Sequence, residues 1–456
     1  MPAGVPISSL PTILGSALAA GDYLIVQLAA GGERRIAASE LCMAVCPFID
    51  ARAFGVVGDG TTDDTEAVQA ALDAGTVSGR SVVLPPGTFK ITETLRYGST
   101  SQQSHYSLIG AGSLASRLRW EGDQTGAGAV LMRPEKMFRG GIRNLGFTNP
   151  AGADGNNNWG ETVGLWLANS TGGTGTGQTG NTFADLHFEG FAQGTVAGDV
   201  VNTRATSELI FDNCLFQYCG TGFQAYDSNT LDIELRLFQA AYCNVGLSVG
   251  QCGNLHVYGG SASYNRADFF FGTGGTFSVN GFRSEVCSEN CVIVSGPGRA
   301  PCRVAIRNCN FQAIKTGGGD YGAGTGGTGG GCAVWLYGGA EVTIDQCHIE
   351  GWVGVADYYS RPKLTMVNTT VRPLPGQTGP FAFYWGTETD QYGDRYLDNL
   401  RYDIRGCSRM EQDSPFWPPV GPTEPEVFYP DPAAFFTDAA GVCPATTSRD
   451  VPAVWD

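Results

Sequence analysis

Charged side chains are scarce in this sequence, and most of them are acidic. Of the 456 residues, 16% are Asp, Glu, Lys or Arg, and the formal net charge is −16. Binding to nucleic acid requires clusters of Lys and Arg that neutralise phosphates, so we expect no nucleic-acid partner. The sequence also lacks any run of about 18 apolar residues, so we expect no membrane insertion.

Motifs for metal binding and secretion are missing as well. The 4 histidines are scattered, and none of the 14 cysteines belongs to the doubled Cys-x-x-Cys pattern of a zinc site. We therefore expect no metal and no cofactor, and we interpret the cysteines as buried thiols. The first residues, "MPAGVPISSLPTILG", lack a basic segment followed by an apolar core, so no signal peptide is predicted.

A six-residue motif recurs through the middle of the chain. Each copy has an apolar residue, a variable one, then Asn, Asp or Gln, then Leu or Cys, and an aromatic residue or Ile two positions later, as in "IRNLGF" (142–147), "FADLHF" (183–188), "FDNCLF" (211–216), "IRNCNF" (306–311) and "IDQCHI" (344–349). The spacing from Cys214 to Cys309 fits four turns of about 24 residues, and Cys347 follows after one turn with a Gly-rich insert. Short strands with such a period predict a parallel β-solenoid, with Asn ladders at its bends. A β-sandwich, the alternative all-β fold, would not repeat one side-chain motif.

The composition divides the chain into three regions. Residues 1–46 contain the strand-like "DYLIVQLA" and a Gly-Gly turn, which indicates a small hairpin. Residues 47–372 hold the repeats. Residues 373–456 are rich in Pro and aromatic residues, which disfavours a sheet interior, and we expect this tail to lie across the end of the solenoid or a neighbouring subunit.

Four acidic residues lie close together in "GVVGDGTTDDTEAVQAALDAG" (55–75). Asp63 and Glu66 have the spacing of a capping box at a helix N-terminus. Val68, Ala71 and Leu72 form an apolar stripe, and Gly75 suits the C-terminal cap. We interpret the acids as the start of a short helix rather than as a metal or catalytic site.

The same segment carries a resemblance to a known family. "DARAFGVVGDGTTDDTEAVQAALDA", followed by "SVVLPPGTFKI", resembles the entry segment of pectate-lyase-like right-handed parallel β-helices, in the form found in bacteriophage tailspikes. The resemblance implies an all-β fold: a right-handed parallel β-helix with a short N-terminal capping helix and a small N-terminal adaptor. Residues 1–46 are similar to the adaptor that attaches such spikes to the virion, which implies other virion proteins as partners.

The sharpest candidate for chemistry is "TLDIELRLFQ" (230–239). If Leu231, Ile233, Leu235 and Leu237 point inward, then Asp232, Glu234 and Arg236 project outward on one strand. Two carboxylates at this spacing suit glycoside hydrolysis, with one as acid and the other as base or nucleophile. We predict Asp232 and Glu234 as catalytic residues.

Neighbouring turns supply candidate substrate-binding residues. Arg236 is expected to bind a sugar carboxylate or tune the pKa of the two acids, and His256, Tyr258 and Glu285 are expected on nearby turns of the same face. The competing interpretation of every one of these residues is a solvated, ion-paired strand surface.

These features together predict a phage or phage-like virion spike. The resemblance implies a homotrimer that binds host capsule or O-antigen polysaccharide and depolymerises it, either as a hydrolase or as a lyase. One alternative is a non-catalytic spike of the tail or head, used for adhesion or as a structural base. A free cellular pectate-lyase-like enzyme is disfavoured by the N-terminal segment and the missing signal peptide.

Overall fold

The computed structural model describes most of the central region and isolated segments near both ends. The described residues are 23–27, 33–37, 47–98, 105–126, 128–153, 158–168, 178–198, 206–226, 230–250, 252–272, 274–288, 290–296, 301–313, 332–356, 362–372, 383–385, 401–409, 426–427 and 436–437. Most of regions 1–46 and 373–456 therefore lies outside the described residues, and those two domain assignments stay predictions.

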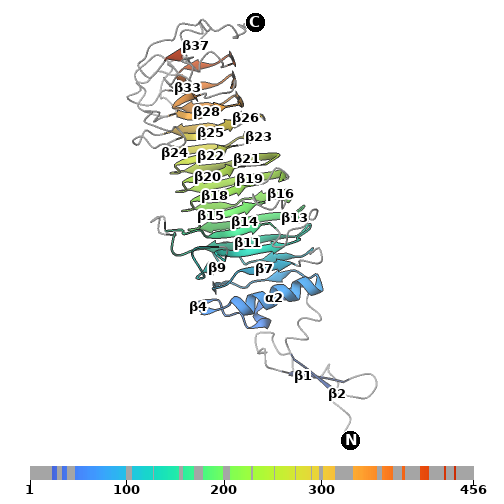
Figure 1. Cartoon of the computed structure of the whole chain (residues 1–456). Coiled ribbons are helices and arrows are strands. Elements are labelled where there is room, and N and C mark those ends of the chain that lie inside the picture. Colours follow the sequence, from blue (N-terminus) through green and yellow to red (C-terminus); the bar gives the residue numbers. More distant parts are fainter. Residues whose placement is uncertain are drawn as a thin grey trace.

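The described body is a parallel β-helix, an elongated stack of coils built from three ladders of parallel strands (Figure 1). The first ladder is a 12-stranded sheet: β7 (Leu95–Gly98), β10 (Val130–Glu135), β12 (Val163–Leu167), β15 (Gln193–Ala197), β18 (Thr221–Ala225), β20 (Val245–Val249), β22 (Ala267–Phe271), β25 (Asn290–Gly296), β28 (Cys332–Gly338), β31 (Trp352–Ala356), β34 (Phe383–Trp385) and β38 (Phe436–Thr437).

The second ladder contains the strand on which the catalytic residues were predicted. It consists of β3 (Ile49–Asp50), β5 (Val82–Val83), β8 (Ser107–Ile109), β11 (Gly141–Thr148), β14 (Thr182–Glu189), β16 (Thr206–Asp212), β19 (Leu231–Ala241), β21 (Asn254–Ser263), β23 (Gly275–Asn280), β26 (Cys302–Arg307), β29 (Ala340–Asp345), β32 (Lys363–Val367) and β35 (Arg401–Arg405).

The third ladder runs beside the second and shares its four longest strands, β11, β14, β19 and β21. Its other members are β4 (Asp59–Asp63), β6 (Gly87–Ile91), β9 (Ser116–Trp120), β17 (Leu215–Gln217), β24 (Arg283–Cys287), β27 (Asn310–Ala313), β30 (His348–Glu350), β33 (Thr370–Arg372) and β36 (Ser408–Arg409). Of the remaining short strands, β13 (Gln178–Thr179) pairs with β16 in parallel, and β37 (Glu426–Val427) pairs with β36 in antiparallel fashion. The strands β1 (Tyr23–Gln27) and β2 (Glu33–Ala37) form an antiparallel pair, the hairpin expected in the N-terminal region.

The strand register confirms the repeat predicted from the sequence. Ile142 pairs with Phe183, and Phe183 with Phe211, so the first positions of three motifs stack on one another. Ile306 pairs with Ile344 in the same way. Cys214, Cys309 and Cys347 are buried, as expected for small core residues.

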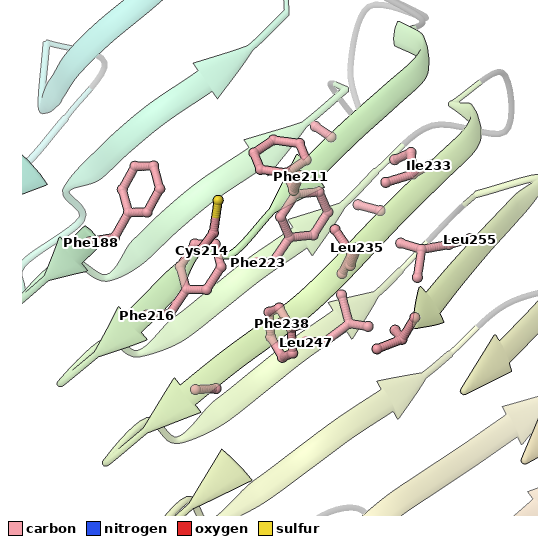
Figure 2. Close-up of a cluster of buried hydrophobic side chains, with 14 of the residues drawn as sticks. Phe188, Phe211, Cys214, Phe216, Phe223, Ile233, Leu235, Phe238, Leu247 and Leu255 are labelled. Atoms are coloured by element: carbon pink, nitrogen blue, oxygen red, sulfur yellow. The ribbon is translucent and has the colours of Figure 1, made fainter. Parts of the chain in front are cut away.

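Stacked aromatic rings fill part of the core (Figure 2). Phe188 lies between Phe147 and Phe216, with ring centroids 4.7 and 5.1 Å away, and Phe183 stacks on Phe211 at 4.5 Å. These spacings match the separation of hydrogen-bonded strands, about 4.8 Å, so each of these coils adds one ring to its stack.

A column of left-handed residues forms the bend between the second and third ladders. Its non-glycine members have φ values from 47° to 55° and are Asn144, Asp185, Asn213, Leu237, Asn308, Gln346 and Asn368. Asn tolerates this conformation better than most residues because its short side chain bonds locally. Polar ladders are present at this bend: Asn213 Nδ2 donates to Asp185 Oδ1 (2.7 Å), and Asn308 Nδ2 donates to Asn280 Oδ1 (3.2 Å).

The predicted capping helix is α2 (Thr65–Ser78), at the end of the stack nearest the N-terminus (Figure 1). Val68, Ala71 and Leu72 are buried as expected. The predicted ends of the helix are wrong by one and four residues. Asp64, not Asp63, is the N-cap residue, and the chain stays helical through Gly75 until Gly79 adopts the left-handed conformation and closes the helix.

The acids ahead of α2 are occupied by turn-forming hydrogen bonds. Asp64 is buried and accepts from the backbone N–H groups of Val57 (2.7 Å) and Gly58 (3.0 Å). Asp63 Oδ1 accepts from the Thr65 hydroxyl at 2.6 Å, which is the main cause of the lowered pKa of Asp63. The structural interpretation of this segment therefore accounts for Asp63 and Asp64.

Parallel pairing continues past the predicted end of the β-helix at residue 372. β35 pairs with β32, and β36 pairs with β33, so at least one more coil is added by residues 401–409. No helix in the described part of the chain is long and apolar enough to cross a membrane.

Candidate functional site

The predicted site residues lie on the outer face of the second ladder. Strand pairing aligns Glu234 with His256 and Arg236 with Tyr258 on adjacent coils. Ile233 and Leu235 are buried, so the side chains of Glu234 and Arg236 project away from the core. The structure thus brings four of the six predicted residues, Glu234, Arg236, His256 and Tyr258, onto one surface.

Asp232 sits at a second left-handed bend rather than in a regular strand, with φ 54°. Its side chain accepts a hydrogen bond from Asn254 Nδ2 at 2.5 Å, and its backbone N–H donates to Asn254 Oδ1 at 2.7 Å. The carboxylate is exposed but held by the asparagine of the next coil.

Glu234 forms an ion pair with Arg236 on the same strand. Glu234 Oε2 accepts from Arg236 Nε at 2.9 Å and from Arg236 Nη2 at 2.5 Å. Both side chains are more than a third exposed, so the pair itself contributes little to stability. It does orient the guanidinium along the surface of the ladder.

His256 and Tyr258 complete this surface from the next coil. A ring nitrogen of His256, Nδ1, lies 2.8 Å from the Ser278 hydroxyl, which fixes the orientation of the imidazole. Tyr258 is 42% exposed, and its ring centroid lies 6.2 Å from that of His256. An exposed aromatic ring beside hydrogen-bonding groups suits stacking against a sugar ring.

Glu285, the sixth predicted residue, lies on the third ladder. It pairs with Ser263, beyond the bend at Gly259 and Gly260, and it forms an ion pair with Arg283. It therefore does not share the surface around Glu234.

Two of the four Leu and Ile residues of β19 whose side chains were predicted to point inward are exposed. Leu231 is 38% exposed and Leu237 is 53% exposed. Leu237 occupies the left-handed bend, where the strict in-and-out alternation of an extended strand is interrupted. The prediction was wrong at these residues because it treated β19 as one uninterrupted strand.

A shallow groove of about 140 Å³ continues the same outer face toward the C-terminal coils. Small residues from successive coils form its floor, and Arg303, Glu341 and Lys363 line it. Arg303 Nε donates to Glu341 Oε2 at 3.1 Å. The second ladder therefore presents polar side chains over many coils rather than at one point.

A larger pocket lies elsewhere, over the first coils of the third ladder. Its volume is about 440 Å³, within the size range of ligand pockets. Its lining residues are Thr88, Arg117, Arg119, Thr148, Pro150, Ala153 and Glu189. The sequence prediction missed this pocket, although "SRLRW" (116–120) alternates buried residues with two arginines.

Comparisons with known proteins agree with this architecture. A family model described as rhamnogalacturonase A/epimerase, pectate lyase-like, matches residues 48–150. This segment of the chain is therefore similar to the pectate-lyase-like family. The mannuronan C5-epimerase AlgE2 of Azotobacter vinelandii is 36% identical over 80 residues, which is 16% of this chain but only 8% of that protein.

A solved epimerase module shows the same fold at low sequence identity. The A-module of the mannuronan C-5 epimerase AlgE6 of Azotobacter vinelandii has a TM-score of 0.53 at 16% identity, covering 80% of this chain and 96% of that one. The Dettilon tailspike protein has a TM-score of 0.41 at 11% identity, covering 80% of this chain and 69% of that one.

The two surfaces differ in their relation to the pectate-lyase-like segment. Five of the seven residues that line the 440 Å³ pocket fall within residues 48–150, and the other two are Ala153 and Glu189. The predicted face around Asp232 and Glu234 lies well beyond that segment. The match therefore supports the fold around the pocket and leaves the roles of Asp232, Glu234, Arg236, His256, Tyr258 and Glu285 as predictions.

Proposed function

We propose that the protein is a spike of a phage or phage-like virion, whose β-helix binds host capsule or O-antigen polysaccharide and depolymerises it. The observation that carries the proposal is the aligned polar face of the second ladder, where Glu234 and Arg236 meet His256 and Tyr258 on the next coil. Each coil adds one row of polar side chains to this long face, which suits a polymeric ligand that lies along it.

Each group on this face has a function in binding a saccharide. Carboxylate oxygens accept hydrogen bonds from sugar hydroxyls, the guanidinium of Arg236 binds a sugar carboxylate, and the exposed ring of Tyr258 packs against a pyranose. For hydrolysis, one of Asp232 and Glu234 protonates the glycosidic oxygen and the other acts as base or nucleophile.

A non-catalytic spike is the second candidate, and the pairing of the two acids favours it. Asn254 holds Asp232, and Arg236 holds Glu234. For hydrolysis, a bound saccharide must reach a carboxylate oxygen of each acid beside these partners. If the partners block that approach, the same face serves adhesion alone.

The remaining parts of the proposal concern assembly. Residues 1–46 attach the spike to other virion proteins, and three copies of the chain form a homotrimer. Light scattering of the full chain tests the trimer, and particle incorporation of a variant without residues 1–46 tests the attachment. A monomer in solution contradicts the trimer, and unchanged incorporation contradicts the attachment role.

The activity is tested by incubating the full chain with polysaccharide from the host envelope and measuring polymer length by gel filtration. Shortened chains establish a depolymerase, and new reducing ends without ultraviolet-absorbing double bonds identify hydrolysis rather than elimination. Asp232→Asn and Glu234→Gln are expected to bind the polymer without shortening it, whereas Glu93→Gln, an exposed acid far from this face, keeps full activity. Binding without shortening by the unmodified protein supports the adhesive spike, and absence of binding overturns the proposal.

A further inference from the structure

We propose that Asp268, Cys287 and Cys291 form a structural zinc site inside the β-helix, a site that does not depend on the function proposed for the outer face. One carboxylate oxygen and the two sulfur atoms lie within 4.8 Å of one another, and all three side chains are buried. Asp268 belongs to β22, Cys287 ends β24 and Cys291 lies on β25. The three ligands therefore come from two successive coils and from two different ladders.

The strand register places Asp268 and Cys291 in a column that is otherwise built from small residues. Their neighbours pair in register, so Asp268 and Cys291 lie opposite each other on adjacent coils. Glycine occupies the same position on the four preceding coils, at Gly164, Gly194, Gly222 and Gly246. Two side chains with metal-binding atoms thus follow a run of glycines on the inner face of the first ladder.

A second column leaves room for these side chains. The column of stacked rings that contains Phe188 and Phe216 continues on later coils with three small residues, Ala240, Ala262 and Ser284. A ring returns on the next coil with Phe311. Because Ser284 stands in place of a ring, the carboxyl group of Asp268 fits beside it and accepts a hydrogen bond from its hydroxyl. The two columns together create a polar cluster in a largely apolar core.

The buried carboxylate is not balanced by the groups that donate to it. Within the described residues, Asn265 Nδ2 donates to Asp268 Oδ1 at 2.9 Å and the Ser284 hydroxyl donates to Oδ2. Both donors are neutral. Buried charges in proteins are usually paired with an opposite charge or coordinate a metal. A divalent cation between the carboxylate and the two sulfur atoms would supply the positive charge.

Cys291 differs from the other buried cysteines in its contacts. Each of the other cysteines in the described part of the chain donates its S–H to a backbone carbonyl, and Cys287 donates to the Arg266 carbonyl at 3.4 Å. The Cys291 sulfur instead accepts from the Ser284 hydroxyl at 3.3 Å, and no carbonyl in that part of the chain accepts from it. A sulfur that accepts hydrogen bonds suits the thiolate form, which is the metal ligand.

The set of ligand atoms favours zinc. Thiolates select Zn²⁺ over Mg²⁺ and Ca²⁺, which take oxygen ligands. Zinc bonds of about 2.0–2.3 Å place the ligand atoms of a tetrahedral site roughly 3.5 Å apart, so small side-chain rotations complete the set. Each thiol releases its proton to solvent on binding, and the Ser284 hydroxyl is placed to act as the fourth ligand. The sequence shows no zinc motif because the aspartate comes from the preceding coil.

Metal analysis of the full chain, without a histidine tag, tests the proposal. The protein is unfolded in chelator, refolded with Zn²⁺ or with Mg²⁺, and analysed by inductively coupled plasma mass spectrometry. About one zinc ion per chain and no magnesium are expected. Zinc should raise the thermal midpoint above that of the metal-free protein, because it binds only the folded site. Refolding with Co²⁺ should give a thiolate-to-cobalt charge-transfer absorption, which shows that sulfur is a ligand.

Asp268→Asn separates a metal ligand from a residue that only packs. In the metal-free protein this substitution should raise the thermal midpoint, because it removes a buried charge. Its zinc affinity should fall about 100-fold or more, since loss of an outer hydrogen-bond partner alone costs about 10–100-fold. Cys291→Ala should lose zinc and the cobalt absorption, whereas Cys214→Ala, which removes a buried thiol of an earlier coil, should keep both.

Three results overturn the assignment. The first is absence of zinc after refolding with Zn²⁺. The second is equal zinc affinity in Asp268→Asn, Cys291→Ala and the unmodified protein, which would place the ion elsewhere. The third is a disulfide between Cys287 and Cys291, found by mass spectrometry of the natively purified protein, which would identify the two sulfurs as a redox pair.

Discussion

Replacing Asp268 by asparagine should stabilise the protein at neutral pH and change little near pH 4. Asp268 lies inside the β-helix on β22 and is fully buried. Its carboxyl group accepts from Asn265 Nδ2 at 2.9 Å and from the Ser284 hydroxyl. These neutral donors do not compensate for burial, which raises the pKa of Asp268 to about 6 from its ordinary value of 3.8.

The magnitude follows from the difference between the folded and unfolded pKa values. Below pH 3.8 the carboxyl is protonated in both states, so it has no effect. Between 3.8 and about 6 only the unfolded state loses the proton, and the free energy of unfolding falls as the pH rises. Above the folded pKa the loss is constant. About two pH units at roughly 1.36 kcal/mol per unit correspond to a loss of about 3 kcal/mol at pH 7.

Asparagine fits the same place without a charge. Its amide can donate to the Ser284 hydroxyl, which lies 3.3 Å from Cys291 Sγ and can donate there instead. Guanidinium unfolding of Asp268→Asn and of the unmodified protein, measured by fluorescence from pH 4 to 7.5, gives the difference in free energy at each pH. This difference should grow by about 3 kcal/mol across the range, whereas the exposed control Asp123→Asn should show no such growth. A difference curve that stays flat would refute a buried carboxyl with a raised pKa.

Further substitutions test the packing of the coils through the same unfolding measurements. Gly260→Ala should destabilise the protein strongly, because the added Cβ would lie 2.0 Å from the Phe238 carbonyl oxygen. The control Gly281→Ala places its Cβ in open space and should cost only about 1 kcal/mol of left-handed backbone strain. Equal losses of unfolding free energy in the two variants would contradict the clash. Leu237→Asn should stabilise by about 1 kcal/mol, since Asn tolerates the left-handed bend, and a loss would show that the exposed leucine packs usefully. Phe216→Ala should cost about 3–5 kcal/mol by opening the ring stack; a loss below 1 kcal/mol would contradict that packing role.

The coil architecture was predictable because residues that stack on one another in a solenoid recur at a nearly regular spacing in the sequence. The motifs that contain Phe183 and Phe211 therefore indicate a shared ladder from the sequence alone. The capping helix was predictable for a similar local reason, since its apolar stripe at Val68, Ala71 and Leu72 needs only a few consecutive residues.

Features that depend on contacts across coils were not predictable. The pocket joins Arg117 to Glu189, which are 72 residues apart, and no short motif links them. The exposure of Leu237 depends on a left-handed bend that most other coils build with Asn or Gly. The hydrogen-bond partners of Asp232 and Glu234 were not predictable either. The sequence does not show whether an asparagine of the next coil binds a given carboxylate.

The bend between the second and third ladders has a consequence for the evolution of this chain. Successive coils return to the same bend although they differ in length, as the pairing of Leu215 with Gln239 and of Arg283 with Asn310 shows. Duplication or deletion of one whole coil would therefore preserve the alignment of every column on the outer faces. Such an event would lengthen or shorten the polar face by one rung of about 4.8 Å. The number of polymer units that the polar face contacts can change in this way during evolution, while each individual contact stays the same.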